Sequence, residues 1–212
     1  ARTVSGEPTS LRLNYVFEND VAVDRLLNYL ENKPDPRLPS RKLIQNTLFI
    51  FTSDNGAEVK HKSATGPFRS NKGSCYEGGH RVPFLISWPD GKIGNGNPYS
   101  GGKVSQQLIG LQDLYATFSN ILRLALPDLR EGEKGAEDSY DLMPAFHGKK
   151  LPDRPMFYHD HKEGTNGAAS AMRLDNPVVS RKLLPGKWKI FFDDSLLRAG
   201  EACPIELFEL SN

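Results

Sequence analysis

A short apolar run with a polar turn directly behind it constrains the fold of this chain more than any other feature. Residues 47–51 show no alternation of apolar and polar side chains, which predicts a strand covered on both faces, as in the parallel sheet of an α/β fold. Ser53-Asp54-Asn55-Gly56 follows at once. Open α/β sheets bind ligands beyond the carboxyl ends of their strands, so this turn is the first candidate for a functional site.

Three further segments complete the predicted α/β part. Apolar side chains at helical spacing indicate helices over residues 15–31 and 104–122. A second apolar run indicates a strand over residues 82–88. Residues 57–80 lie between the two strands. This segment is long, polar and rich in glycine, which is typical of a loop that is either functional or disordered.

The pattern changes near residue 150. Beyond it no strong helical pattern remains, and short apolar runs at 156–158, 187–192 and 205–210 indicate an antiparallel sheet. We therefore expect residues 1–150 to belong to an α/β domain and residues 151–212 to form a small antiparallel β subdomain.

Net charge and hydropathy bear on whether the chain binds nucleic acids or membranes. The 27 Lys and Arg residues nearly balance 26 Asp and Glu residues, so the net charge of +1 gives no electrostatic basis for binding a nucleic acid or a membrane surface. No apolar run approaches the roughly 20 residues that span a bilayer. We expect neither a nucleic-acid partner nor a membrane span.

The turn and the glycine-rich loop carry a distinctive set of polar groups. Asp54 offers an anionic oxygen and Asn55 a neutral carbonyl oxygen, and hard cations such as magnesium and calcium take such ligands. Lys72 carries a compact positive charge that suits a tetrahedral oxyanion such as sulfate or phosphate. Together these residues predict a site that holds a cation and an oxyanion.

Each of these residues also has a plain structural interpretation. An Asn-Gly pair such as Asn55-Gly56 is a common turn. Lys72 taken alone is a solvated surface lysine. Glu77 and Arg81, which lie four residues apart, can form an ion pair with each other, and His80 is interpreted as structural.

Two segments closely resemble signatures of the type I sulfatases, which belong to the alkaline-phosphatase-like superfamily. Residues 46–56, the first signature, resemble the metal-site strand of that family, and residues 66–83, the second signature, resemble its other conserved segment. The likeness continues in family order through residues 15–30, 111–118, 140–148, 186–189 and 206–210. The resemblance implies the large mixed-sheet domain of that superfamily, followed by its small C-terminal sheet.

The resemblance also implies roles for single residues. Asp54 and Asn55 would ligate calcium, and Lys72 would contact the sulfate group as a catalytic and substrate-binding residue. His61 lies in the long loop and is a further candidate for substrate binding. The implied substrate is a sulfated small molecule or carbohydrate, and the implied location is exported, that is periplasmic, secreted or lysosomal.

In this family the nucleophile is a formylglycine, made from the first residue of a Cys/Ser-x-Pro-x-Arg motif. Its hydrated aldehyde attacks sulfur, and calcium polarises the sulfate. Neither Cys75 nor Cys203 fits the motif, and the nearest serine, Ser87, has Gly91 where arginine is required. We therefore expect the C-terminal portion of a sulfatase, which supplies calcium ligands and a lysine but no nucleophile and is inactive by itself.

Two alternatives keep the fold but change the function. Related members of the superfamily cleave phosphodiesters or phosphonates instead of sulfate esters. A non-catalytic fragment or pseudoenzyme would bind ligands without turning them over. Whatever the function, we expect the lack of the upstream strands to leave an exposed sheet edge and apolar surface through which the chain associates.

Overall fold

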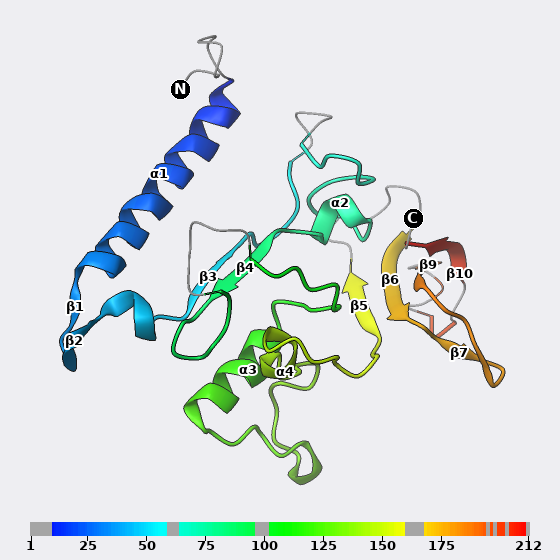
Figure 1. Ribbon diagram of the computed structural model, residues 1–212. Coiled ribbons are helices and arrows are strands. Elements are labelled where there is room, and N and C mark those ends of the chain that lie inside the picture. The colour runs from blue at the N-terminus through cyan, green and yellow to red at the C-terminus, as the bar shows by residue number, and fades with distance from the viewer. Residues whose placement is uncertain are drawn as a thin grey trace. The chain divides into compact units, whose positions relative to one another are not determined.

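The computed structural model describes residues 10–58, 64–95, 102–159, 168–193, 196, 199–201 and 204–210 (Figure 1). The chain divides into two compact units. The first contains residues 1–50 and 86–104, and the second contains residues 51–85 and 105–212. The turn after the first strand, the second signature and the C-terminal sheet all belong to the second unit.

The first unit contains one long helix and a small hairpin. Helix α1 (Leu11–Asn32) confirms the helix predicted over residues 15–31. It begins earlier because the Ser10 hydroxyl accepts a hydrogen bond from the Leu13 N–H at 3.3 Å. It ends ahead of Pro34, which disfavours helical geometry in the preceding residue. Among the residues that the structure covers, no helix is both long and apolar enough to cross a membrane. The unit continues with β1 (Pro34–Asp35), the antiparallel β2 (Leu38–Lys42) and the 3-10 helix η1 (Leu43–Asn46).

Strands β3 (Phe49–Thr52) and β4 (Phe84–Ser87) confirm the two predicted apolar strands. They form a two-stranded sheet, and the chain passes from one unit to the other within each of them. The expectation that the first strand is covered on both faces is wrong. Phe51 is 40% exposed and Leu85 is 56% exposed, so the described residues leave one apolar side chain of each strand uncovered.

The predicted helix over residues 104–122 forms only in its second half, as α3 (Asp113–Leu122). The Asp113 carboxylate accepts a hydrogen bond from the Gly110 N–H at 2.7 Å, which holds residues 110–113 in a turn ahead of the helix. Glycine is also a poor helix former, so the preceding residues stay irregular. The other helices of the second unit are short: α2 (Glu77–His80), η2 (Leu129–Glu131) and α4 (Met143–Phe146).

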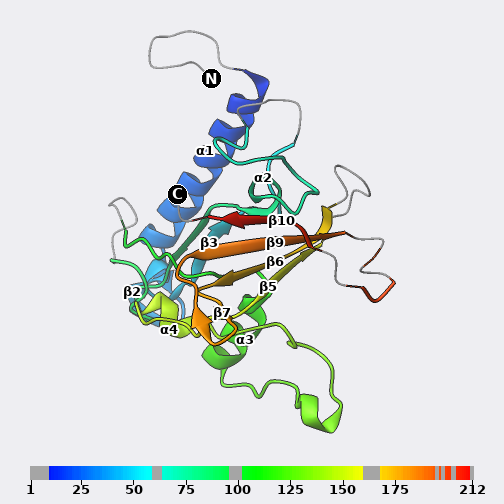
Figure 2. The ribbon, with the colours of Figure 1, turned by 90° about the vertical axis from the view of Figure 1, so that its right-hand side faces the viewer.

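The predicted antiparallel sheet is confirmed, and Figure 2 shows its strands side by side. Four strands pair antiparallel in the order β10-β9-β6-β5. They are β5 (Met156–His159), β6 (Ala168–Asp175), β9 (Lys187–Asp193) and β10 (Pro204–Glu209). A separate ribbon contains β7 (Val178–Val179) and β8 (Lys182–Leu183). The domain boundary predicted after residue 150 stays a prediction.

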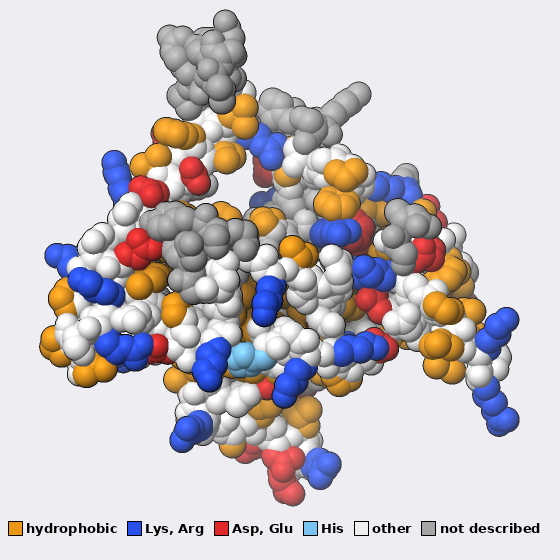
Figure 3. Space-filling model, viewed as in Figure 1, with side chains coloured by type: hydrophobic (Ala, Val, Ile, Leu, Met, Phe, Trp, Pro, Cys, Tyr) orange, Lys and Arg blue, Asp and Glu red, His pale blue; other side chains and the backbone are white. Residues whose placement is uncertain are grey.

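Two apolar clusters form the core of the second unit. One contains Cys75, Tyr76, Ala171 and Phe191, so it joins the second signature to the middle of the sheet. The other is centred on Leu142 and packs beside α3 and α4. Many large apolar side chains nevertheless remain exposed, and Figure 3 shows such side chains on the face in view. Association of the chain through an exposed sheet edge stays a prediction.

Candidate functional site

Main-chain hydrogen bonds bring the two signatures together. The Gly56 N–H donates to the Gly79 carbonyl oxygen at 2.8 Å. The Lys72 N–H donates to the Ala57 carbonyl oxygen at 2.9 Å. The turn that carries Asp54 and the loop that carries Lys72 are therefore parts of one substructure, although a long loop separates them in the sequence.

Glycine is required where these segments meet. A Cβ atom on Gly56 would overlap the carbonyl oxygen of Gly78, and one on Gly78 would overlap the carbonyl oxygen of Ser70. Gly73 has a φ of 86°, in the left-handed region that favours glycine. The glycines of the second signature thus permit both the close main-chain approach and the positive φ that this substructure requires.

The candidate ligands lie at the accessible side of this substructure. Asp54 is exposed and Asn55 is half-buried. The Lys72 side chain is 49% exposed, and its Nζ lies 3.9 Å from Oε1 of Glu58, which makes a loose ion pair. An ammonium group in this state is free to exchange its partner for an oxyanion. His61 lies outside the described residues, so its assignment as a substrate-binding residue stays a prediction.

The donor atoms present here fit calcium but do not complete a site. Asp54 and Asn55 supply two hard oxygen ligands, whereas calcium takes 6–8. In the described part of the chain, no group of three or more His, Cys, Asp or Glu side chains is placed to hold a metal ion. Asp54 and Asn55 are thus suited to contribute part of a calcium shell.

A buried ion pair lies behind the second signature. Lys189 of β9 is only 1% exposed, and its Nζ lies 3.1 Å from Oε1 of Glu77 in α2. The same Nζ lies 2.5 Å from Nε2 of His80 and 4.0 Å from the centre of the Tyr158 ring. The His80 and Tyr158 rings stack at a centroid distance of 4.0 Å. This cluster fixes α2, and with it the end of the second signature, onto the C-terminal sheet.

The protonation states of the cluster follow from burial and charge. Burial lowers the pKa of Lys189 to about 8, although Glu77 partly offsets the effect. Burial and the neighbouring ammonium lower the pKa of His80 to about 4, so its ring is neutral at pH 7. Its Nε2 lies near both the Lys189 ammonium and the Cys75 carbonyl oxygen, which is 3.1 Å away. Burial alone would raise the pKa of Glu77, but the charge of the Lys189 ammonium and its hydrogen bond to the carboxylate outweigh burial and lower that pKa. The pair is therefore ionised at neutral pH.

The second carboxylate oxygen of Glu77 faces Arg81. The distance from Oε2 to Nη1 of Arg81 is 3.6 Å, which is an ion pair without a hydrogen bond. The pairing of Glu77 with Arg81 that the sequence allowed is thus present, but the closer partner of Glu77 is Lys189. His80 is packed inside the same cluster, in agreement with its structural interpretation.

The start of the second signature is held by the last strand. The Tyr76 hydroxyl donates to Oε2 of Glu206 in β10 at 2.5 Å. The Arg69 guanidinium stacks 3.8 Å from the centre of the Tyr76 ring and lies 3.4 Å from the same carboxylate oxygen. Burial and this hydrogen bond raise the pKa of Tyr76 to about 12. Both ends of the signature are therefore anchored on the sheet.

Comparison with known proteins identifies the family. The family model described as Sulfatase matches residues 2–124, which include the first signature, the second signature and α3. The chain belongs to the sulfatase family. The family resemblance of the two signatures is confirmed. The predicted α/β part followed by a small antiparallel sheet is also present in the structure.

Several curated sulfatases are similar to this sulfatase chain. N-acetylgalactosamine-6-sulfatase of Canis lupus familiaris is 35% identical over 158 residues, which cover 71% of the chain and 26% of the relative. Human arylsulfatase A is 35% identical over 121 residues, 55% of the chain and 21% of the relative. Human steryl-sulfatase is 28% identical over 186 residues, 84% of the chain and 27% of the relative. The chain thus spans about a quarter of the length of these relatives.

One solved structure is also similar to the sulfatase chain, the crystal structure of Ps i-CgsB in complex with k-i-k-neocarrahexaose. It is 27% identical and superimposes with a TM-score of 0.48 over 70% of this chain and 28% of that chain.

Residues behind the sulfatase signatures were missed by reasoning from the sequence. The apolar run over residues 187–192 predicts a strand but no role for Lys189. Alternation along β9 nevertheless places Lys189 on the same face as Phe191, which is buried. A lysine on the apolar face of a strand is a signal for a buried ion pair. Its partner Glu77 lies 112 positions away, so no local pattern indicates it.

Proposed function

We propose that the protein containing this chain hydrolyses sulfate esters, with Asp54 and Asn55 as calcium ligands and Lys72 as the sulfate-binding lysine. The observation that supports the proposal most directly is the pair of main-chain hydrogen bonds, Gly56 to Gly79 and Lys72 to Ala57, that joins the two signatures of a sulfatase. We propose a sulfated carbohydrate or small molecule as substrate and an exported location.

In this proposal the chain supplies a positive charge to the sulfate group and ligands that position the cation. Bound calcium would supply Lewis acidity toward the sulfate oxygens. The Lys72 ammonium offsets negative charge on the sulfate group as the ester bond breaks, and Asp54 and Asn55 hold the cation beside it. The sequence contains no Cys/Ser-x-Pro-x-Arg motif, so we assign the formylglycine nucleophile to sequence outside these 212 residues. The chain by itself is then inactive.

The test uses the full-length protein and an aryl sulfate ester. Lys72→Ala should lower kcat/KM by roughly 10²–10³-fold, as the loss of one preorganised charge contact does. Lys182→Ala removes an exposed lysine of β8 and serves as the matched control, with an expected change below about twofold. Asp54→Ala should lower activity and raise the calcium concentration that restores activity after chelation.

The same assay separates the alternatives. An aryl phosphonate ester run in parallel tests phosphonate hydrolysis, and faster turnover of that ester would overturn the assignment to sulfate. Full activity of Lys72→Ala would remove the lysine from the site. A full-length protein that binds calcium but turns over neither ester would be a non-catalytic binder.

A further inference from the structure

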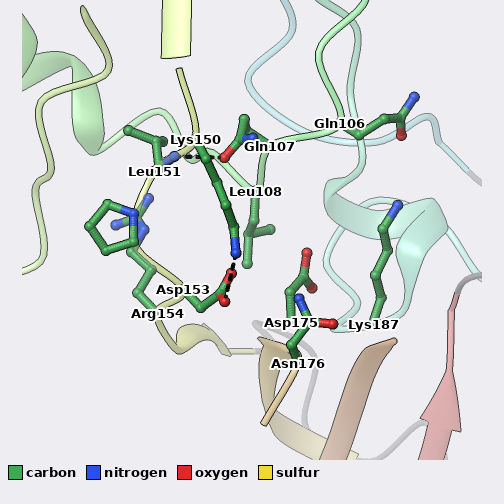
Figure 4. A pocket seen from close by; sticks show the side chains of 11 residues that line it. Gln106, Gln107, Leu108, Lys150, Leu151, Asp153, Arg154, Asp175, Asn176 and Lys187 are labelled. Atoms are coloured by element: carbon green, nitrogen blue, oxygen red, sulfur yellow. Dashed lines mark hydrogen bonds and ion pairs between the residues drawn. The ribbon is translucent and has the colours of Figure 1, made fainter. Parts of the chain in front are cut away.

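A polar cavity of about 200 Å³ lies in the second unit, away from the residues of the proposed catalytic site. Residues 106–108, residues 150–154 and the facing ends of β6 and β9 line it (Figure 4). Its lining includes none of the candidate ligands Asp54, Asn55 and Lys72. Pockets for drug-sized ligands measure about 300–1,000 Å³, so this cavity has room for a smaller molecule, about one sugar ring.

Hydrogen bonds hold the walls of the cavity in place. The Gln107 side-chain oxygen accepts from the Leu151 N–H at 2.9 Å, which ties two of the walls together (Figure 4). On the sheet side, the Asn176 N–H donates to the Gly186 carbonyl oxygen at 2.7 Å. The Gly186 N–H in turn donates to the Asn176 side-chain oxygen at 3.1 Å. A cavity fixed in this way is preorganised for a ligand.

Two of the three cations that line the cavity, Lys150 and Arg154, have carboxylate partners. Lys150 pairs with Asp153 at 3.1 Å, as the dashed line in Figure 4 shows. The Arg154 guanidinium is committed to the buried carboxylate of Asp113. These contacts satisfy both cations on the wall formed by residues 150–154.

Lys187 on the opposite wall differs from these cations. Its cross-strand neighbour is Asp175, but that carboxylate binds the Arg173 guanidinium at 3.1 Å. The nearby Glu209 carboxylate accepts from the Lys187 main-chain N–H at 3.0 Å. Among the described residues, no carboxylate lies within ion-pair distance of the Lys187 ammonium. One half-buried cation therefore faces the cavity without an anionic partner.

We propose that this cavity binds one acidic saccharide unit, with Lys187 holding its sulfate or carboxylate group. The other lining groups suit a sugar ring: the Gln106 and Asn176 amides and the Asp153 carboxylate hydrogen-bond hydroxyl groups, and Leu108 offers an apolar surface between the walls (Figure 4). The choice of an acidic sugar rests on the proposed function, while the position of the site rests on the cavity and its unpaired cation.

The experiment measures binding and not turnover. Full-length protein carrying Asp54→Ala and Lys72→Ala, which removes the proposed catalytic contacts, is titrated with galactose 6-sulfate, galactose and sodium sulfate by NMR. We expect galactose 6-sulfate to bind about tenfold more tightly than either of the other probes, because only it satisfies both the cation and the hydroxyl-binding groups. Added Lys187→Gln should remove that advantage, and Lys187→Arg should retain it.

Lys182→Gln is the matched control, because it removes an exposed lysine of the neighbouring ribbon and should leave binding unchanged. Equal binding of galactose and galactose 6-sulfate would overturn the proposal, and so would sulfate ion binding as tightly as the sugar. Unchanged binding in Lys187→Gln would also overturn it. Failure of the proposed sulfatase activity would leave this binding result intact, since the catalytic contacts are absent from the protein titrated.

Discussion

Lys189→Met is the substitution that best tests how the second signature is held in place. The ammonium of Lys189 is fully buried between Glu77, His80 and the Tyr158 ring. Methionine keeps nearly the same length and volume but removes the charge. The side chain of Glu77 is only 12% exposed, so its carboxylate would then be left in the protein interior without its closest partner.

The size of the effect follows from these contacts. Loss of the charge-assisted hydrogen bond to Glu77 costs about 1.5–3 kcal/mol. Loss of the cation–π contact with Tyr158 costs about 1–2 kcal/mol, and burial of the methionine side chain returns about 1 kcal/mol. Arg81 still lies 3.6 Å from the carboxylate, which keeps the result near the lower end of the roughly 3–5 kcal/mol for a broken buried pair. We expect the free energy of unfolding to fall by about 3 kcal/mol.

Urea denaturation followed by circular dichroism measures this change as a shift in the midpoint at constant m value. The double variant Lys189→Met with Glu77→Gln leaves no unpaired charge. Its free energy of unfolding should therefore exceed the value predicted from the sum of the two single changes by at least about 1 kcal/mol. Lys182→Met, on the exposed β8, should cost less than about 0.5 kcal/mol. A loss below about 1 kcal/mol in Lys189→Met, or strict additivity in the double variant, would refute the argument.

Three further predictions concern the same unit. The pKa of His80 is about 4 in the folded state and 6.5 in the unfolded chain, so the unfolded chain binds the additional proton as the pH falls from 6.5 to 4. The free energy of unfolding should therefore decrease by about 3 kcal/mol across that window, and His80→Phe should flatten the decrease; equal slopes in denaturation series for the two proteins would contradict this. Gly78→Ala forces a Cβ onto a main-chain carbonyl oxygen and should cost more than about 2 kcal/mol, whereas Gly102→Ala, with open space around it, should change stability by less than about 1 kcal/mol. Arg154→Met leaves the fully buried carboxylate of Asp113 unpaired and should cost about 3–5 kcal/mol in thermal or urea unfolding; a neutral result would show that water reaches this carboxylate.

Features encoded within a few residues were predictable from the sequence. The apolar run of β3, the turn behind it and the short strands β5, β9 and β10 follow from local patterns, and the structure contains them all. Strand β6 (Ala168–Asp175) was not predicted, because alanine and aspartate are depleted in strands and this segment forms through pairing on both sides. Tertiary pairing overrides local propensity there.

The sequence was less informative where the hydrogen bonds of a single side chain determine whether a segment becomes helical. Helical spacing continues through residues 104–112, but the Gln107 side chain binds the Leu151 main chain and the Asp113 carboxylate binds Gly110, so these residues line a cavity and do not extend α3. For the candidate ligands, the sequence predicted that the segments carrying them lie together, and the structure shows this for the main chain alone. The hydrogen bonds join the segments that carry Asp54 and Lys72, and the convergence of their side chains on one cation and one anion stays a prediction.

The two buried ion pairs suggest why the small sheet accompanies the signatures. Glu77 pairs with Lys189, and Asp113 pairs with Arg154, so each pair joins a residue before position 150 to one after it. Buried pairs add little net stability, but they strongly disfavour any arrangement in which one partner is missing. The C-terminal segment that contains the sheet therefore helps to position the helices that precede it in the sequence. Lys189 of β9 holds α2 in place, and Arg154, in the segment just before β5, holds α3. Through α2, Lys189 also helps to position the glycine-rich loop that presents Lys72.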